Sequence, residues 1–305
     1  YKMKKVLIQL YNRLYDIKIT INEYIYRNIL PKPNIMSRED TLNYIIEKNV
    51  SVSRIGDGEL KLIDGESIGF QRADPILAVR MKEILKSDDD KCLVCLTNIW
   101  GNLQHLDEKA RKYYTFTLAN KRKSWYSYID MEKKYGSADI TRFYNGIQDV
   151  KNAENYVPKL KTLWEAKDVL IVEGNQSRMG VGNDLFDNTK SIRRILCPTL
   201  NAFSIYETIL QAAKKYAKKE DVIIVALGPT ATVLSYDLAQ EGYKAWDLGH
   251  MDIVYEWYVR RAVEKIKIEG KYVNETMDGR VFSECNDEKY KREIILELCG
   301  ECGES

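Results

Sequence analysis

The segment Val222-Ile-Ile-Val-Ala-Leu-Gly-Pro-Thr-Ala-Thr232 contains the pattern that decides the predicted fold. Its first six residues are apolar and rich in β-branched side chains, as in a parallel strand that is buried on both faces. Glycine ends this run, and the Pro-Thr-Ala-Thr that follows is typical of the first turn of a helix. A strand that leads directly into a helix is half of a βα unit.

The same pattern recurs on both sides of this segment. Short apolar runs that predict further strands lie at 50–55, 92–97, 169–173, 194–197 and 243–247. Ser37 with Asp40, and Asp74 with Pro75, mark the starts of two helices. We therefore predict an α/β fold, a Rossmann-like and mostly parallel sheet with helices on both faces.

We divide the chain into three parts. Residues 1–36 form an N-terminal amphipathic helix and a connector, residues 37–265 hold the sheet, and residues 266–305 form a C-terminal extension. In that extension we predict a hairpin that turns at Asp278-Gly279, followed by a charged helix. The periodicity is weakest from Asp139 to Pro158, so we interpret this stretch as an insertion or a lid.

The composition narrows the class of protein. The chain has 305 residues, 45% of them apolar and 30% charged, which suffices for one large or two small cores and excludes disordered and collagen-like chains. Lys and Arg number 47 against 45 Asp and Glu, a net charge of +2. Because nucleic-acid-binding domains are usually clearly basic, we expect no nucleic-acid partner.

The N-terminal helix has an apolar stripe. Leu7, Leu10, Leu14, Ile17 and Ile21 recur at helical spacing. We expect this stripe to pack on the body of the protein, with a membrane surface as the alternative. No stretch approaches the roughly 18 to 20 apolar residues that span a bilayer, and the basic start lacks a signal-peptide cleavage site. The predicted location is therefore the cytoplasm, with the inner face of the membrane as a further candidate.

The cysteines include two Cys-x-x-Cys pairs, Cys92 with Cys95 and Cys299 with Cys302. Four thiolates at this spacing are one way to bind zinc. However, Cys92 and Cys95 fall in a predicted strand, where side chains three residues apart point to opposite faces. We therefore expect buried thiols in place of a zinc site.

Ligands of open parallel sheets bind beyond the carboxyl ends of the strands, so the residues after each strand are the candidate site. Arg54-Ile-Gly-Asp-Gly-Glu59 is the first such segment. Gly56 permits a tight turn, and Asp57 and Glu59 project in similar directions if the backbone stays extended. Two carboxylates suit Mg²⁺ or Mn²⁺ that bridges to phosphate, and Arg54 suits an anion. An ordinary Asp-Gly turn is the alternative.

The turn after residues 222–227 is a candidate phosphate-binding site. Gly228 ends the strand, and Pro229 and Thr230 begin a helix whose first N–H groups can face an anion. The segment has neither the lysine of a Walker loop nor the Gly-x-Gly-x-x-Gly spacing, which argues against a kinase-like NTPase and an NAD enzyme. An ordinary strand-to-helix turn is the alternative reading.

A third candidate segment follows the strand at 243–247. A helix that begins near Met251 would place Asp252 and Glu256 on one face, with His250 at its start. The histidine suits a phosphate or a metal, and either carboxylate suits a general base toward a hydroxyl group. A buried histidine beside two solvated acids is the structural alternative.

The loop after the strand at 169–173 is rich in glycine. Arg178 and Asn183 lie among Gly174, Gly180 and Gly182. Such a loop is suited to closing over a phosphate or a ribose.

Four of these segments together resemble a known family. The matching runs are Ser53–Leu60, Val172–Phe186, Ala226–Thr232 and Leu248–Trp257. In this order they are similar to the GT-D-fold bacterial glycosyltransferases, long described as a domain of unknown function. The likeness extends from about Ser37 to Arg261. It implies a Rossmann-like sheet distinct from the GT-A and GT-B folds, and the use of UDP-glucose in building O-linked glycans on serine-rich bacterial adhesins.

The resemblance also implies roles for individual residues. Asp57 and Glu59 fall on the Asp-x-Glu motif that the family associates with the divalent cation and the nucleotide sugar. His250 and Glu256 fall on its His-x-Asp-x-x-x-Glu motif. We therefore predict a UDP-sugar-dependent hexosyltransferase, a glucosyltransferase in the first instance, that uses Mn²⁺ or Mg²⁺. Its acceptor would be a hydroxyl group of a growing glycan on a glycoprotein or a cell-surface polysaccharide, with other glycosyltransferases as candidate partners.

This prediction divides the residues between donor and acceptor. The residues that position UDP and its phosphates are Arg54, Gly56, Arg178, Asn183, Gly228, Pro229 and Thr230. His250 steadies the departing UDP, and Glu256 or Asp252 activates the acceptor. Two alternatives stay open: a metal-dependent phosphohydrolase or nucleotidyltransferase, and a non-catalytic module that binds a nucleotide sugar or a glycan.

Overall fold

The computed structural model describes residues 2–104, 106, 108–146, 149–276, 279 and 285–300. These residues fall into two compact units. The smaller unit comprises Tyr1–Ile35 and Asn98–Tyr135, and the larger unit comprises Met36–Thr97 and Gly136–Ser305. Asp278, where the hairpin turn is predicted, and Cys302 of the second cysteine pair lie outside the described residues.

The larger unit is built on a parallel sheet. The strands of the chain are β1 (Asn34–Ile35), β2 (Ser51–Ile55), β3 (Cys92–Leu96), β4 (Lys134–Ser137), β5 (Asp168–Gly174), β6 (Ser191–Cys197), β7 (Val222–Ala226), β8 (Lys244–Asp247) and β9 (Ile294–Glu297). From β4 onward they lie in the order β4-β3-β2-β8-β7-β5-β6-β9, and every strand pair that the structure describes is parallel. Within the smaller unit, β1 pairs with the first two residues of β4. This topology confirms the predicted Rossmann-like α/β fold.

Helices connect the strands. In the larger unit they are α2 (Arg38–Lys48), α3 (Asp57–Ile63), α4 (Pro75–Lys86), α6 (Val150–Lys161), α7 (Tyr206–Tyr216), α8 (Pro229–Gln240), α9 (Met251–Val259) and α10 (Glu288–Glu293), with the short 3-10 helices η1 (Ala138–Thr141) and η3 (Ala202–Ile205). Both predicted helix caps form. The Ser37 hydroxyl accepts a hydrogen bond from the Asp40 N–H group at 3.0 Å, and the Asp74 carboxylate accepts one from the Ile76 N–H group at 2.8 Å.

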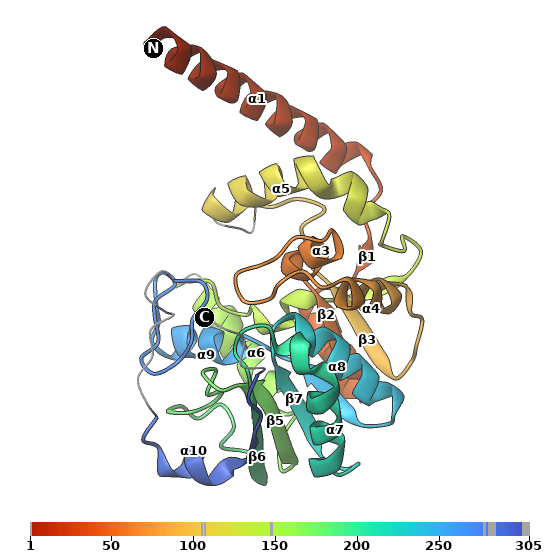
Figure 1. Ribbon diagram of the computed structural model, residues 1–305, viewed down its shortest axis with the longest axis vertical. Coiled ribbons are helices and arrows are strands. Elements are labelled where there is room, and N and C mark those ends of the chain that lie inside the picture. Colours follow the sequence, from red (N-terminus) through yellow and green to blue (C-terminus); the bar gives the residue numbers. More distant parts are fainter. Residues whose placement is uncertain are drawn as a thin grey trace. The chain divides into compact units, whose positions relative to one another are not determined.

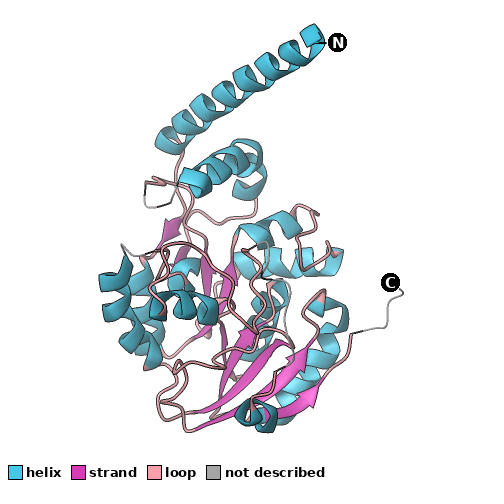
Figure 2. Cartoon of the chain, turned by 90° about the vertical axis from the view of Figure 1, so that its left-hand side faces the viewer, coloured by secondary structure: helices cyan, strands magenta, loops and turns pink. Residues whose placement is uncertain are grey.

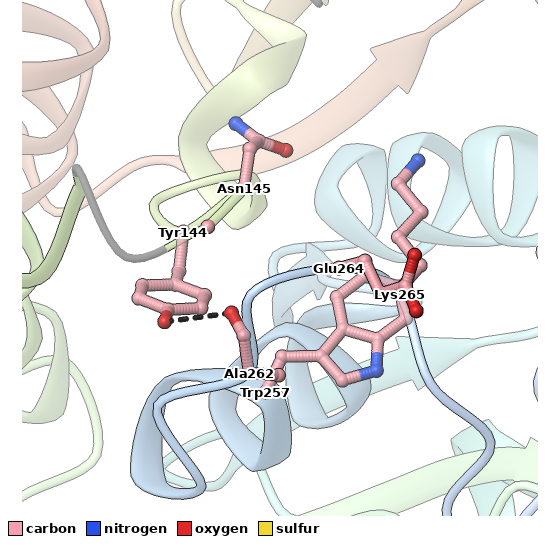
Figure 3. A pocket seen from close by; sticks show the side chains of 7 residues that line it. Tyr144, Asn145, Trp257, Ala262, Glu264 and Lys265 are labelled. Atoms are coloured by element: carbon pink, nitrogen blue, oxygen red, sulfur yellow. Dashed lines mark hydrogen bonds between the residues drawn. The ribbon is translucent and has the colours of Figure 1, made fainter.

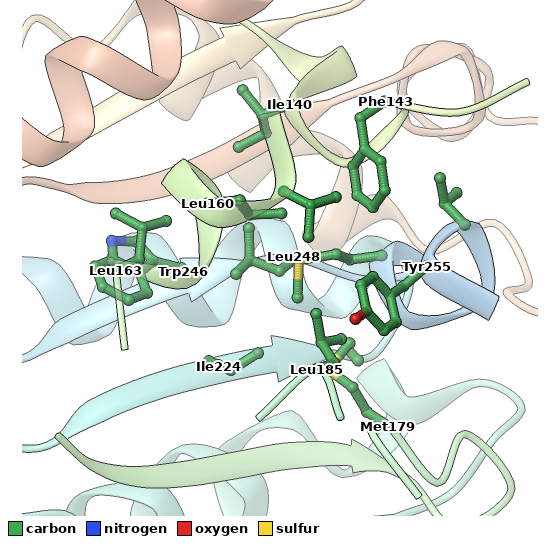
Figure 4. Packing of buried hydrophobic residues seen from close by; sticks show 14 of the residues in the cluster. Ile140, Phe143, Leu160, Leu163, Met179, Leu185, Ile224, Trp246, Leu248 and Tyr255 are labelled. Carbon is green, nitrogen blue, oxygen red and sulfur yellow. The ribbon is translucent and has the colours of Figure 1, made fainter. Parts of the chain in front are cut away.

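Hydrophobic packing covers both faces of the sheet. Along β5, Val169 and Ile171 join the core cluster that includes α6 and α9, part of which Figure 4 shows around Trp246 and Leu248. The alternate residues Leu170 and Val172 join the cluster that includes α7 and α8. Helices therefore lie on both sides of the strands (Figure 2), because successive side chains of a strand point to opposite faces.

The prediction of an insertion or a lid at 139–158 is wrong. Tyr156 and Leu160 of α6, with Ala153, are buried in the core cluster on β5. The Tyr156 hydroxyl donates a hydrogen bond to the backbone carbonyl of Ile140 at 2.9 Å. The helical pattern is weak in the sequence because α6 carries Pro158 in its interior and exposes polar residues between its buried ones.

The segment 288–297 also contributes to the sheet. After α10, the strand β9 pairs in parallel with β6 and forms that edge of the sheet. The end of the described chain is therefore a structural part of the larger unit.

Cys92 and Cys95 of β3 are buried, as predicted, and so is Cys197. Over the part of the chain that the structure describes, no group of three or more His, Cys, Asp or Glu side chains is arranged to hold a metal ion.

The smaller unit pairs α1 (Lys2–Ile29) with α5 (Glu108–Tyr126). Glu23 of α1 is fully buried and is bound by the Arg122 guanidinium, and Arg27 Nη2 lies 3.2 Å from Glu23 Oε1. The apolar stripe is not covered within this unit, because Leu10 and Leu14 are more than half exposed. The contact face of α1 instead contains Ile19 and Glu23. None of the helices in the described ranges is long and apolar enough to cross a bilayer.

We predict that the buried ion pair between β5 and β6 is essential to stability. Arg194 Nη1 lies 2.7 Å from Glu173 Oε1, and neither side chain reaches solvent. Arg194→Met would leave the Glu173 carboxylate buried and unpaired, which should lower the free energy of unfolding by roughly 3–5 kcal/mol in urea titrations. The double variant Glu173→Gln/Arg194→Met should recover much of the loss.

The matched control is Lys190→Met in the exposed pair of Lys190 with Asp168, where Lys190 is 67% exposed. Lys190→Met should lower the free energy of unfolding by at most about 1 kcal/mol. An equal, small loss for both single variants would contradict the account.

Candidate functional site

The segments predicted as a site follow strands that are neighbours in the sheet. The strands β2, β8, β7 and β5 lie side by side in this order and run in the same direction. Their carboxyl ends therefore meet at one edge, and the loops after them converge. This edge is where Rossmann-like sheets bind their ligands.

Arg54 ties these strand ends together. Its Nε donates to the carbonyl oxygen of Asp247 at 2.7 Å, and Nη2 donates to the Asp247 carboxylate at 2.9 Å and to the Gly249 carbonyl at 3.1 Å. Nη1 donates to the Thr141 hydroxyl at 2.8 Å and to the Ala138 carbonyl at 3.2 Å. A guanidinium has five N–H groups, and all of them bind protein. Arg54 thus positions the turn before α9, and none of its N–H groups is left for the predicted phosphate contact.

Asp57 and Glu59 lie in the first turn of α3, where we expected extended backbone. Glu59 folds back so that its Oε2 accepts a hydrogen bond from the Gly56 N–H group at 2.8 Å. Residues two apart on a helix point in different directions. Asp57 accordingly faces Lys61, whose Nζ lies 4.0 Å from Asp57 Oδ2. The expectation of parallel carboxylates is wrong, because the helix cap uses one of them.

Glu59 nevertheless lies in a place that favours a cation. Burial and the negative charge of Asp247 raise the pKa of the Glu59 carboxyl to about 7. A positive charge next to it would stabilise the ionised form. Mg²⁺ is commonly held by one or two carboxylates together with water and substrate phosphates. Glu59 could supply one such carboxylate, whereas Asp57, on the same turn, faces Lys61.

The turn at Gly228 requires glycine for two reasons. Its φ is 52°, and a Cβ atom there would lie 2.6 Å from Cε2 of Phe70. Pro229 and Thr230 follow as the first residues of α8 and are buried. The Thr230 hydroxyl finds no hydrogen-bond partner among the residues described, which is the condition of a group that a ligand could satisfy.

The first turn of α8 is fixed against the end of β2. The Thr232 hydroxyl donates to the Arg54 carbonyl at 2.8 Å, and the Ser53 hydroxyl donates to the Thr232 carbonyl at 2.8 Å. The phosphate-binding candidate at Gly228 and the acidic candidate at Asp57 are therefore held on adjoining elements.

Asp252 and Glu256 share one face of α9, as predicted, but a lysine lies between them. Lys271 Nζ is 2.6 Å from Asp252 Oδ2 and 3.0 Å from Glu256 Oε1, and the lysine is 4% exposed. Asn183 Nδ2 donates to Asp252 Oδ1 at 2.8 Å and to Glu256 Oε1 at 2.7 Å. The four side chains form one buried, hydrogen-bonded cluster.

This cluster controls the basicity of Glu256. Burial by itself raises the pKa of the Glu256 carboxyl, but the charge of Lys271 and hydrogen bonds from Asn183, Lys271 and Arg260 outweigh it. The net pKa lies below the usual range. Glu256 is therefore ionised at neutral pH, although a carboxylate held at low pKa is a weaker base.

His250 is the residue directly before α9 and has a left-handed backbone, with a φ of 70°. Burial, and after it the positive charge of Arg142, lower the pKa of the imidazole to about 3, so the ring is neutral at physiological pH. Its Nε2 lies 3.2 Å from Glu275 Oε1, and the ring packs edge-on against Trp257 with 5.7 Å between centroids. A neutral imidazole can donate one hydrogen bond, as contact with a phosphate requires.

Glu275 joins His250 to two cations. Its carboxylate is bound by the Arg142 guanidinium and lies 2.5 Å from Lys265 Nζ. Burial opposes ionisation, but these charges hold the pKa of Glu275 well below its usual range. A small pocket adjoins this group around Glu275 and is lined by Lys265, Trp257 and Tyr144, among others (Figure 3).

Arg178 faces the same C-terminal segment. Its φ is 49°, its Nη1 donates to the Gly270 carbonyl at 2.7 Å, and its Nε is buried without a partner in the described chain. Residues 270–275 therefore contact three predicted elements: Arg178, the carboxylates of α9 and His250. Lys271 and Glu275 are not among the predicted site residues, because nothing in the local sequence pattern distinguishes them from other charged residues of a polar segment; their burial alone marks them.

Many nucleotide-dependent enzymes have a Rossmann-like sheet with acidic and anion-binding groups at the ends of its strands. Comparison with known proteins is more specific. Residues 52–276 match the family described as Glycosyltransferase GT-D fold. The chain belongs to this family of glycosyltransferases, as the resemblance of its motifs predicted.

Two curated relatives carry the same kind of name. The chain is 40% identical over 269 residues to the Probable glycosyl transferase Gly of Streptococcus gordonii, and 36% identical over 283 residues to Glycosyltransferase GlyD of Streptococcus pneumoniae serotype 4. These matches cover 88% and 91% of this chain but 39% and 34% of the relatives. The chain thus spans well under half the length of either.

Solved structures show the same fold. A structure described as a new glycosyltransferase from Streptococcus sanguinis matches with a TM-score of 0.82 and 39% identity, over 88% of this chain and 100% of that one. Another, described as a highly conserved domain of unknown function with a distinct glycosyltransferase fold, matches with a TM-score of 0.84 and 38% identity, over 90% and 99%.

We predict that His250 makes stability depend on pH. The unfolded histidine binds a proton below about pH 6.5, whereas the folded ring stays neutral until pH approaches about 3. The free energy of unfolding should therefore fall with decreasing pH in this window, by about 1.4 kcal/mol per pH unit from this residue. Asparagine tolerates the left-handed backbone at this position, so the variant His250→Asn should fold but lack this pH-dependent contribution to stability.

Urea titrations of both proteins at a series of pH values check the prediction. Parallel stability curves for wild type and His250→Asn across the window would show that the ring is not held neutral.

Proposed function

We propose that this chain is a UDP-sugar-dependent hexosyltransferase, with glucose as the first candidate sugar. It would transfer the sugar to a hydroxyl group of a growing glycan on a glycoprotein or a cell-surface polysaccharide. One observation carries the proposal: hydrogen bonds between Thr232 and the end of β2 hold the start of α8 beside the acidic start of α3. A sugar diphosphate needs both elements, N–H and hydroxyl donors for its oxygen atoms and carboxylates for its cation. Family membership supports glycosyl transfer.

On the donor side, Asp57 and Glu59 would hold Mn²⁺ or Mg²⁺, which would neutralise charge on the departing diphosphate. The Thr230 hydroxyl and the first N–H groups of α8 would bind phosphate oxygen atoms. Arg54 would act indirectly, because it holds the Asp247–Gly249 turn through its hydrogen bonds.

On the acceptor side, Glu256 or Asp252 would accept the proton of the attacking hydroxyl group. Lys271 and Asn183 orient the two carboxylates before substrate arrives, and their contacts help to keep Glu256 ionised. His250, neutral at physiological pH, would donate a hydrogen bond to UDP as the bond to the sugar breaks.

The first test of this proposal measures UDP release from a panel of UDP-sugars, because slow hydrolysis of the donor needs no acceptor. We expect release from one sugar in the presence of Mn²⁺, and its loss with EDTA or in Asp57→Ala. The matched control is Glu66→Ala, an exposed acid just beyond α3, which should behave as wild type.

Other products would contradict the proposal. Release of inorganic phosphate or pyrophosphate would indicate a phosphohydrolase or a nucleotidyltransferase. Thermal stabilisation by UDP, with no turnover of any sugar, would indicate an acceptor-gated transferase or a binding module.

A second prediction distinguishes a role of Glu256 in proton transfer from a role in UDP binding. Glu256→Gln should slow turnover at least about 100-fold, the usual contribution of a general base, and leave UDP affinity nearly unchanged in calorimetry. Asp252→Asn is the parallel variant, and Glu220→Gln, an exposed acid between α7 and β7, is the control. Wild-type turnover in both Glu256→Gln and Asp252→Asn would show that the general base does not lie on α9.

A further inference from the structure

Residues 7–21 of α1, the long helix in Figure 1, present an apolar stripe to solvent. Leu7, Leu10, Leu14, Ile17 and Ile21 are each more than half exposed. The helix is held in its unit by its other face, through Ile19 and the buried Glu23. A continuous exposed stripe of this length marks an interaction surface.

The unit that carries the stripe is strongly basic. Residues 1–35 and 98–135 contain 15 Lys and Arg against 6 Asp and Glu, a balance of +9. The remaining residues contain 32 Lys and Arg against 39 Asp and Glu, a net charge of −7. The near-neutral total of +2 therefore hides two units of opposite charge, and the surface around the stripe complements an anionic partner.

The charges beside the stripe disfavour a second copy of this chain as the partner. The stripe repeats every three and four residues, as the a and d positions of a coiled coil do. Lys4, Arg13 and Lys18 then occupy the flanking e and g positions. In a parallel pair Arg13 would face Lys18 of the partner, and in an antiparallel pair cations would again face each other. A homodimer through this stripe would bring like charges together.

We infer that α1 docks the protein on an anionic lipid surface. A helix with an apolar face and basic flanks lies in the membrane interface, where its cations meet lipid phosphates. Tyr11 and Tyr15 stack on each other, 6.3 Å between centroids, along one edge of the stripe. Tyrosine is favoured at this depth because it has an apolar ring and a polar hydroxyl group. The inference goes beyond the proposed transferase activity and does not depend on it.

Vesicle sedimentation tests this inference with the full chain. Wild type should bind vesicles of phosphatidylcholine mixed with phosphatidylglycerol, and high salt should release it. Leu10→Ser/Leu14→Ser should abolish binding. Arg13→Gln/Lys18→Gln should weaken it roughly 30-fold, from the loss of two basic residues near the surface.

Matched controls lie in the larger unit. Leu200→Ser changes an apolar residue that is 53% exposed, and Lys151→Gln/Lys167→Gln removes two exposed cations. Both should bind as wild type. Circular dichroism checks that each variant is folded, which the design favours because Ile19 and Glu23 are untouched.

Three outcomes would overturn the inference. The first is absence of binding to anionic vesicles by folded wild type. The second is equal binding to vesicles of phosphatidylcholine alone. The third is self-association in sedimentation that Leu10→Ser/Leu14→Ser abolishes, without vesicle binding, which would make a second copy the partner.

Discussion

The hydrogen bonds of the Arg54 guanidinium are the constraint on which the candidate site depends. They connect the end of β2 to the end of β8, to η1 and to the turn before α9. The backbone carbonyl of the same residue accepts from Thr232, so α8 is fixed at this point as well. Since β2 and β8 are neighbouring strands at the middle of the sheet order, one residue, through its side chain and its backbone carbonyl, sets the relative positions of the acidic, anion-binding and histidine-containing segments.

The features that sequence predicts well here are those encoded locally. Strands such as Val222–Ala226 are short apolar runs, and caps such as Ser37 and Asp74 act over two or three residues, so both can be read from neighbouring positions. The rule that parallel strands place their carboxyl ends at one edge then brings four distant segments together. The fold and the place of the site follow from these patterns.

The side-chain chemistry of the site depends on contacts that no local pattern shows. Lys271 reaches Asp252 and Glu256 from 19 and 15 positions away, and changes Glu256 from a solvated acid into part of a buried ion-pair cluster. Glu59 is an exception, because it caps α3 through the Gly56 N–H group only three residues away, a local contact that an extended backbone would not form. The sequence predicts Arg54 as an anion ligand, but its guanidinium N–H groups already donate hydrogen bonds to neighbouring groups of the protein. The contacts of Lys271 and Arg54 join residues that are distant in the sequence, which local spacing does not encode.

The central claim is that the start of α3 and the start of α8 together bind a metal-bound nucleotide diphosphate. A crystal structure with UDP and Mn²⁺, with the metal located by its anomalous scattering, tests it most directly. We expect the Mn²⁺ peak beside the carboxylates of Asp57 and Glu59, and the diphosphate at Gly228 and Thr230. A Mn²⁺ peak between Asp252 and Glu256, or UDP bound away from both helix starts, would contradict the account.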